Sequence, residues 1–332
     1  MDWTSHIGRH VKLRHLHVLI TVIESGSMGK AAAALAVSQP VVSKSIAELE
    51  EAVGQRLLDR SKQGVTPTIY GRALLACSTA VFDELRQGVR TLEFLADPAS
   101  GEIRIGCTEP AAMGFVPAVI QRLTKRNPRI VVQVVIGDSA TLAERNLRER
   151  RIELVVGATP GGDPTTDLDV DLLFEDLHVV MAAGTNKWLR RRDIALADLV
   201  DEPWILPPTE SGSGKGIAQA FRSYGLEPPK SRVVAFSIPL CQHLLASGRF
   251  LAVLPVTMAK LAGRASLRLV DVEWPRIRRA VAIVTLKDRT LSPTAGLFIE
   301  YARETAKSWM TNVGPLPMVS GTSRRPRAKR RA

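Results

Sequence analysis

The sequence is poor in the features that mark secreted, metal-binding or membrane proteins. Only three of its 332 residues are cysteine, and Cys77, Cys107 and Cys241 lie far apart without metal-ligand spacing, which fits a reducing cytoplasm. No stretch reaches about 18 consecutive apolar residues, which argues against a membrane span. The first ten residues, MDWTSHIGRH, have no apolar core followed by a small-residue cleavage site, so we expect no secretory signal.

A catalytic or metal-binding set is also missing from the sequence. Four of the six histidines fall before or within the first predicted helix. Cys241 and His243 are two residues apart, but no further ligand cluster accompanies them, and a core or surface role explains them more simply. Acidic pairs such as Glu50–Glu51 fall on helix faces, where exposure to solvent is the simplest interpretation. The sequence therefore predicts no enzyme activity, no metal and no cofactor.

The stretch TESGSGKG, residues 209–216, invites comparison with a phosphate-binding loop. That motif needs Ser or Thr after its Gly-Lys pair and a glycine five positions before that pair begins. Here Gly216 follows Lys215 and position 209 is threonine, so we reject a nucleotide-binding loop. A helix that begins near Ser213 can still receive an anion through its free N–H groups.

A formal net charge of +12 suggests a polyanionic partner. Half of this excess lies in the last ten residues, SRRPRAKRRA, which carry six basic groups and no acid. We expect these residues to belong to a disordered tail, residues 313–332, which is either a solvated end or an auxiliary DNA contact. Net charge alone therefore does not identify the partner.

Two short helices are predicted at the start of the chain. The first has apolar residues at helical spacing, namely Leu13, Leu16, Leu19, Ile20 and Ile23. Gly26 ends this helix, and Ser27 can cap a second helix over residues 28–35. Only Ala36 and Val37 separate the second helix from the cap of a third.

The third helix begins at Ser38, and Pro40 falls in its first turn, where the missing N–H costs nothing. Its apolar stripe can pack on the first two helices and consists of Val42, Ile46 and Leu49. Ser43, Lys44 and Ser45 are expected at the surface, Ser45 as a merely solvated position. Short helices, a very short turn and an exposed start of the third helix predict a helix-turn-helix.

A short extended pair and a long helix follow. QRLLDRSKQGVTPT turns around Gly64 like the wing of a winged helix, and Thr68 can cap a helix over residues 69–96. Within that helix, apolar residues step by 7, 3, 4 and 3 as in a coiled-coil seam: Leu75, Phe82, Leu85, Val89 and Leu92. The seam can pack within its own chain, but a helix between domains has little to pack on, which favours a dimer.

Beyond the hinge DPASG, residues 97–101, the pattern changes to alternating strands and helices, typical of a parallel α/β sheet. Strands are predicted at 103–107, 130–136, 153–156, 178–182, 204–206, 232–235 and 250–254. Helices are predicted at 112–125, 140–148, 215–224, 239–246 and 293–309. These residues can fold as two lobes, with the chain crossing near Asp176 and returning near Arg279. A chain of 332 residues suits two or three domains.

The stretch AAAALAVSQPVVSKSIAELEEAVGQRLLDR resembles the DNA-binding signature of LysR-type transcriptional regulators. The matching positions are Ala31, Ala32, Leu35, Ser38, Gln39, Pro40, Val42, Ser43, Ile46, Leu49, Glu50, Gly54, Leu57 and Arg60. VTPTIYGRALL is similar to the family's entry into its linker helix, and PWILPP and ASGRFLAVLP resemble stretches of its effector domain. Within the family, VSKSIAELE, PWILPP and LSPTAGLFIEYA look most like the branch that contains the galactose-binding-protein regulator and some aromatic-catabolism regulators. Leu58, where Phe is frequent, and the basic tail from Arg324 depart from the family form.

The resemblance implies the fold and its boundaries. We expect a winged helix-turn-helix over residues 1–67, a linker and dimerisation helix over 68–97, and an effector-binding domain over 101–312. The last would be a two-lobed α/β domain like that of periplasmic binding proteins. The predicted function is a cytoplasmic transcriptional regulator that forms a homodimer or homotetramer and binds a dyad operator in double-stranded DNA. RNA polymerase is a further partner that this function allows.

The resemblance also assigns DNA contacts. A recognition helix places its N-terminal side chains at base edges in the major groove, where Gln39 can bond an adenine edge. Ser43 and Lys44 can reach a base or a phosphate, and other contacts would set register on phosphates without reading sequence. The complete predicted DNA-binding set is Ser27, Lys30, Ser38, Gln39, Pro40, Ser43, Lys44, Arg60 and Lys62.

The predicted effector is a small molecule, either sugar-related or an organic or aromatic acid, bound between the lobes. Ligands in open α/β folds bind beyond the carboxyl ends of the strands, and the predicted contacts there are Thr108, Glu109, Pro110, Pro208, Thr209 and Ser237. Thr108 and Ser237 are equally interpretable as plain helix N-caps. Glu109 suits a sugar or another hydroxyl better than a carboxylate. The alternative functions are a solute-binding protein and a non-specific DNA-compacting protein.

Overall fold

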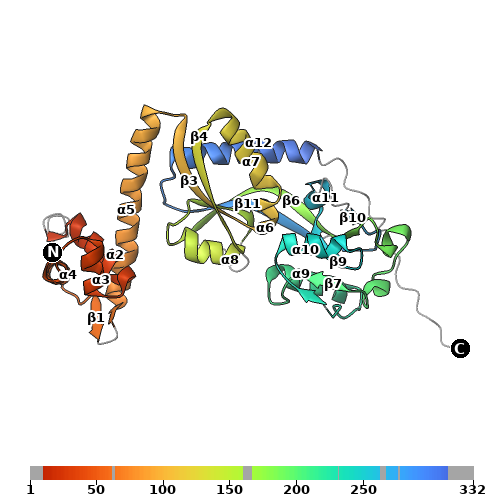
Figure 1. The fold of residues 1–332 in the computed structure, drawn as a ribbon, viewed down its shortest axis with the longest axis horizontal. Coiled ribbons are helices and arrows are strands. Elements are labelled where there is room, and N and C mark those ends of the chain that lie inside the picture. Colours follow the sequence, from red (N-terminus) through yellow and green to blue (C-terminus); the bar gives the residue numbers. More distant parts are fainter. Residues whose placement is uncertain are drawn as a thin grey trace. The chain divides into compact units, whose positions relative to one another are not determined.

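The computed structural model describes residues 10–61, 64–159, 167–230, 232–261, 267–275 and 277–312. The chain divides into two compact units, residues 1–92 and residues 93–332, which are described separately. Figure 1 colours the elements along the chain. The predicted basic tail, residues 313–332, and Lys62 lie outside the described residues.

Three helices form the core of the first unit, as the sequence predicts: α2 (Leu13–Ser25), α3 (Met28–Ala34) and α4 (Gln39–Val53). The stripe on α4, Val42, Ile46 and Leu49, is completely buried against α2 and α3. The prediction for α2 is partly wrong, because Leu13 is 49% exposed while the β-branched Val18 and Val22 are buried in its place.

The two predicted serine caps occupy the right positions but make no side-chain cap bond. Ser27 and Ser38 both precede their helices with extended backbone. For Ser38 the reason is that Pro40, the second helical residue, has no N–H to donate, and the N–H of Val41 bonds the Ser38 carbonyl at 3.0 Å. The prediction that Ser45 is solvated is also wrong, since it is buried in α4.

The turn between α3 and α4 strains one residue. Ala36 has φ = 54°, in the left-handed region, and its neighbour Val37 donates to the Ala32 carbonyl at 3.0 Å. This conformation costs a residue with a Cβ roughly 1–2 kcal/mol, part of which glycine recovers.

We therefore expect Ala36→Gly to stabilise the helix-turn-helix by about 0.5–1 kcal/mol in thermal denaturation, because glycine relieves the strain at some cost in chain entropy. Ala33→Gly, exposed in the interior of α3, is the matched control and should destabilise by about 0.5–1 kcal/mol. Equal destabilisation by both changes would contradict the strain argument.

The predicted wing is a two-stranded antiparallel pair, β1 (Leu58–Ser61) and β2 (Gly64–Pro67). Glu50 fastens it to α4, because its carboxylate accepts the N–H groups of Leu57 at 2.7 Å and Leu58 at 3.3 Å. The interpretation of Glu50 as a solvated residue is therefore wrong. The N–H of Val65 donates to the Gly26 carbonyl at 2.9 Å, which ties the wing to the end of α2.

The long helix α5 (Ile69–Ala96) follows the wing. Thr68 caps it as predicted, since its hydroxyl accepts the N–H of Gly71 at 3.0 Å and donates to the Arg56 carbonyl at 2.8 Å. The predicted seam divides into two parts. Phe82 packs against the core of α2–α4, whereas the later seam residues are exposed and are Leu85, Val89 and Leu92.

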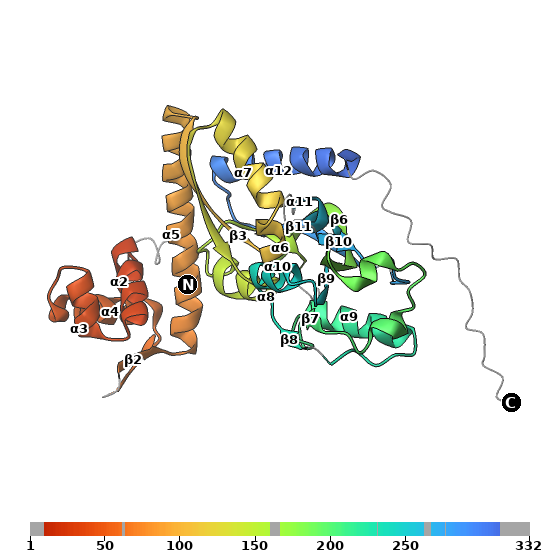
Figure 2. The same ribbon diagram turned by 45° about the vertical axis from the view of Figure 1, so that its right-hand side comes forward.

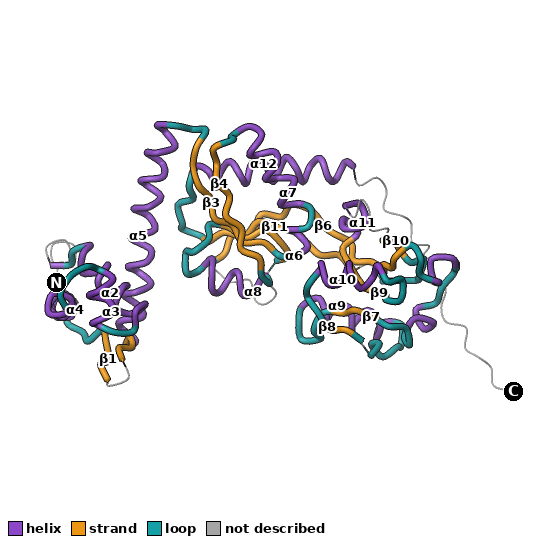
Figure 3. The backbone as a smooth tube through the Cα atoms, in the orientation of Figure 1, coloured by secondary structure: helices purple, strands orange, loops and turns teal. Residues whose placement is uncertain are grey.

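The second unit contains a nine-stranded sheet in the order β4-β3-β5-β11-β6-β9-β7-β8, with β10 paired to β6 (Figure 3). One lobe holds the parallel strands β3 (Ser100–Cys107), β4 (Arg129–Ile136) and β5 (Leu154–Ala158). The other lobe holds the parallel strands β7 (Trp204–Leu206), β8 (Val233–Val234) and β9 (Leu251–Pro255), with the short β10 (Leu267–Leu269). The sheet is therefore parallel only within each lobe.

Two antiparallel strands join the lobes, β6 (Leu168–Ala183) and β11 (Ile277–Leu286). Asp176 pairs with Arg279 in their register, so the chain crosses between lobes at the two predicted positions. The predicted strand 178–182 covers only the second half of β6, and the sequence pattern predicts neither β10 nor β11. The first half of β6, LDVDLLFE, mixes acidic with apolar side chains, and its buried Leu168 and Leu173 belong to the hydrophobic clusters of the first lobe.

Helices cover both faces of each lobe (Figure 2). In the first lobe, α7 (Phe115–Arg126) and α12 (Pro293–Asn312) pack on one face, and α8 (Ser139–Thr141) with a π-helical segment (Leu142–Leu147) on the other. The predicted helix 140–148 is therefore mostly π-helical. In the second lobe, α9 (Gly212–Ser223) packs on one face, and α10 (Ile238–Ala246) with α11 (Val256–Leu261) on the other. A one-turn helix, α6 (Glu109–Ala112), follows β3.

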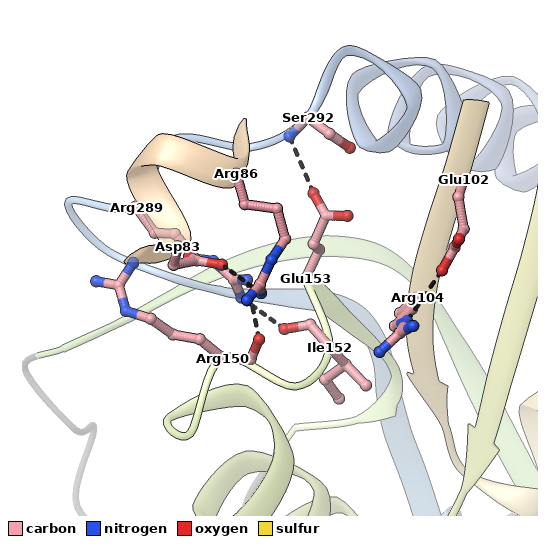
Figure 4. A network of polar contacts seen from close by, with 9 residues as sticks. All are labelled: Asp83, Arg86, Glu102, Arg104, Arg150, Ile152, Glu153, Arg289 and Ser292. Atoms are coloured by element: carbon pink, nitrogen blue, oxygen red, sulfur yellow. Dashed lines mark hydrogen bonds and ion pairs between the residues drawn. The ribbon is translucent and has the colours of Figure 1, made fainter. Parts of the chain in front are cut away.

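A buried polar network holds the connection into α12 against the first lobe (Figure 4). Glu153 is 1% exposed, and its carboxylate accepts the N–H of Ser292 at 2.9 Å. The buried guanidinium of Arg289 donates to the carbonyl of Ile152. These bonds satisfy charges that would otherwise be costly to bury.

Candidate DNA-binding and effector sites

The start of α4 forms an exposed polar surface. Ser38, Gln39 and Pro40 are exposed at its first turn, which contains no acidic residue. The first turn of a helix presents unpaired N–H groups and the positive end of the helix dipole, and both attract anions. This end of α4 can therefore approach a phosphate backbone without electrostatic opposition from its own side chains.

The other predicted DNA contacts differ in how exposed they are. Ser43 is half-buried, while Lys44 is exposed with its Nζ 3.9 Å from a carboxylate oxygen of Glu48. The α3 residue Gly29 lies near the Gln39 side chain, since a Cβ on Gly29 would come 3.7 Å from Gln39 Oε1. The starts of α3 and α4 are thus adjacent. The rest of the predicted set consists of Ser27 before α3, the exposed Lys30 in α3 and the exposed Arg60 in β1.

Between the lobes of the second unit, one predicted effector residue makes a direct contact. Glu109 begins α6 in the first lobe, and Ile238 begins α10 in the second lobe. The Glu109 carboxylate accepts the N–H of Ile238 at 2.9 Å. A carboxylate at a helix N-terminus is in its preferred position. Glu109 therefore binds the helix end at which the sequence analysis places an effector.

The hydrophobic contact beside Glu109 reinforces this junction. Met113, just beyond α6, packs against the second lobe's cluster that contains Ile238 and Cys241. Burial, and secondarily the charge of Glu109, raises the pKa of the Cys241 thiol to about 11. Burial likewise raises the pKa of Cys107 to about 11. Both thiols are therefore protonated and unreactive near neutral pH.

The remaining predicted effector residues lie at the ends of strands or the starts of helices. Thr108 precedes α6 without a side-chain cap bond, whereas the Ser237 hydroxyl accepts the Leu240 N–H at a weak 3.5 Å. Pro110 is exposed in α6. The Pro208 carbonyl accepts the Ser211 N–H at 3.0 Å, and Thr209 beside it is exposed.

Two residues that sequence analysis does not assign to the site lie where the chain crosses between lobes. His178 on β6 is half-buried, and desolvation together with the charge of Arg279 lowers its pKa to about 4. Burial also lowers the pKa of Arg279 on β11. The sequence feature that could have drawn attention to Arg279 is the cluster of basic residues ahead of the apolar run of β11, RIRRAVAIV.

No metal centre accompanies these sites within the described ranges, where no group of three or more His, Cys, Asp or Glu side chains could hold an ion. Among the same residues, no helix combines the length and hydrophobicity needed to cross a membrane.

Two family models match the chain. The model for bacterial regulatory helix-turn-helix proteins of the lysR family matches residues 13–72, and that for the LysR substrate binding domain matches residues 96–307. The HTH-type transcriptional regulator GbpR of Azospirillum brasilense is 29% identical over 315 residues, covering 94% of this chain and 92% of GbpR. TdcA of Escherichia coli K12 is 27% identical over 293 residues, covering 88% of this chain and 93% of TdcA.

Solved structures share the fold across nearly the whole chain. A full-length OxyR variant from Pseudomonas aeruginosa aligns with a TM-score of 0.63 at 20% identity, covering 90% of this chain and 95% of OxyR. CbnR, described as a LysR family transcriptional regulator, aligns with a TM-score of 0.60 at 20% identity, covering 89% of this chain and 99% of CbnR. CbnR in complex with its target DNA aligns with a TM-score of 0.52 at 21% identity, covering 89% of this chain and 100% of CbnR. With both family models and the fold in agreement, this chain belongs to the LysR family of DNA-binding transcriptional regulators and carries that family's effector-binding domain.

Proposed function

We propose that this regulator binds a dyad operator as a homodimer or homotetramer and responds to a small-molecule effector held between its lobes. It acts in the cytoplasm, where a bacterial regulator meets its DNA, and by binding rather than by catalysis. The observation that carries the proposal is the exposed, acid-free start of α4, with Gln39 at its surface. Two-fold protein symmetry then requires paired half-sites in the DNA.

Exposed apolar surface supports self-association. The last third of α5 exposes a row of apolar side chains, Leu85, Val89, Leu92 and Leu95. The edge strand β4 also exposes apolar side chains, on both of its faces, namely Val131, Val134, Val135 and Ile136. Apolar surface of this extent is typical of protein–protein contacts, and an exposed edge strand invites pairing. A second copy of the chain is the partner that an operator with a dyad requires.

The direct test is the footprint and stoichiometry of the protein on a selected operator. We expect two protected half-sites separated by about one or more helical turns of DNA, and an even number of chains in the complex by native mass measurement. A single protected half-site bound by one chain would contradict the proposal.

Within the effector domain, we propose that the bond between Glu109 and the N–H of Ile238 holds the lobes together until an effector binds beside it. An effector that changes this contact would shift the population of lobe arrangements and, through the oligomer, the spacing of the DNA-binding heads. The bond is charge-assisted and joins two segments 129 residues apart. The bond therefore joins the two lobes at the place where we propose that the effector binds.

Glu109→Ala tests this contact. We expect it to lower the stability of the second unit by about 1.5 kcal/mol, because the Ile238 N–H loses a charged acceptor, and to enlarge the radius of gyration measured by X-ray scattering. Glu102→Ala is the matched control, since Glu102 pairs with Arg104 at 3.0 Å on the same strand and should cost less than about 1 kcal/mol. Equal effects of the two variants on stability and dimensions would contradict a role between lobes.

A further inference from the structure

Arg279 is a half-buried cationic residue of the second unit. It stands on β11 opposite Asp176, at the crossing between lobes, and its guanidinium donates to the Gly212 carbonyl in the first turn of α9. A Cβ on Gly212 or Gly216, one turn apart on α9, would come 3.5 Å from a guanidinium nitrogen, which is ordinary van der Waals contact. The guanidinium therefore lies against the start of α9.

The charge of Arg279 is half-buried and has no counter-ion among the described residues. Asp176, its cross-strand neighbour, directs its carboxylate instead to the N–H and hydroxyl of Thr257. The adjacent Arg278 differs, because it is exposed and pairs with Glu175 at 2.8 Å. A cation beside the positive end of a helix is unfavourable, and an anion between them would satisfy both.

His178 supplies an independent observation at the same place. It pairs with Ile277 in the register, so it shares a sheet face with Arg279 and lies diagonal to it, within reach of a long side chain. This is the face that α9 covers. Its Nδ1 is buried and makes no hydrogen bond, although buried polar atoms are normally paired. Because the low pKa keeps the ring neutral, one ring nitrogen can donate to an anion and the other can accept.

We propose that Arg279, His178 and the first turn of α9 form the subsite for a carboxylate group of the effector, which makes the effector an organic acid. This inference rests on the proposed effector-binding function and specifies its ligand. One guanidinium and one neutral imidazole match a single negative charge better than a phosphate dianion, and a guanidinium binds a carboxylate with two parallel hydrogen bonds.

The test is thermal denaturation and calorimetric titration of the full-length protein with acetate, benzoate and succinate at constant ionic strength. Galactose and inorganic phosphate serve as the neutral and the phosphate comparisons. At least one of the three acids should stabilise the wild type and bind it. Arg279→Gln should weaken that binding by about ten- to a hundred-fold, the loss of a charged hydrogen-bond donor pair.

Arg278→Gln is the matched control and should bind the acid as the wild type does. Arg279→Lys keeps the charge and should retain part of the affinity, which provides a second variant if the glutamine form does not fold. Stabilisation of the wild type by galactose or phosphate alone, by none of the acids, or by the acids equally in the wild type and Arg279→Gln would overturn the proposal. DNA selection without added ligand separates this failure from that of the regulator itself, because Arg279→Gln should recover the same DNA sites.

Discussion

Gly71→Ala is expected to destabilise the DNA-binding unit by about 3 kcal/mol, the upper end of the usual cost of overpacking. A Cβ on Gly71 would lie 2.0 Å from the Leu57 carbonyl oxygen and 3.3 Å from the Cβ of Pro67. The nearest atom belongs to the backbone, whose N–H and C=O groups also make hydrogen bonds at the junction of the wing and α5. Moving this backbone aside would therefore cost free energy. The variant should separate α5 from the wing.

Denaturant unfolding followed by hydrogen exchange in residues 13–67 measures this effect. Gly88→Ala is the control on the same helix, because a Cβ there would meet nothing within 4 Å and alanine favours the helix by about 0.8–1 kcal/mol. Gly88→Ala should therefore leave the unit unchanged or more stable. Unaltered exchange protection in Gly71→Ala would show that the close packing of α5 on Leu57 is wrong.

Gln39→Ala is expected to reduce discrimination between the operator and random DNA by about 1–3 kcal/mol, or roughly five- to 150-fold. Gln39 lies exposed at the first turn of α4, and the variant would lose the bidentate amide contact to adenine that we propose for it. Affinity for random DNA should change little.

Arg60→Ala is the contrasting variant for this experiment, because the phosphate contact that we propose for Arg60 on β1 would contribute equally on all sequences. It should weaken operator and random DNA alike and reduce the salt dependence by about one unit in slope. Competition binding at a series of salt concentrations measures the ratio of operator to random affinity for each variant and the salt slope of Arg60→Ala. If Gln39→Ala weakened both kinds of DNA to the same degree, Gln39 would position the backbone and not read sequence.

The first unit can be predicted in detail because its information is local. The stripe of Val42, Ile46 and Leu49 and the cap at Thr68 follow from spacing within a few residues, and both are present. The errors arise where a distant partner decides the outcome. Glu50 has the pattern of a solvated residue, but the wing brings the N–H groups of Leu57 and Leu58 to its carboxylate.

In the second unit, the sequence locates the crossings between lobes but not the contacts that they bring together. Glu109 is placed correctly after β3, yet its partner Ile238 lies 129 residues away, and no spacing rule connects them. Arg279 and His178 meet only through the antiparallel register of β6 and β11. Because the sequence pattern does not predict β11 as a strand, the pairing that puts the guanidinium beside α9 cannot be inferred from it.

We propose that this LysR-family protein recognises specific DNA through the start of α4. Selection of genomic fragments by the purified full-length protein at physiological salt, followed by sequencing, tests it most directly. We predict a recurring site with imperfect dyad symmetry near promoters, lost in Gln39→Ala. Uniform recovery of all fragments by the wild type would contradict the claim and leave only non-specific binding by the basic residues.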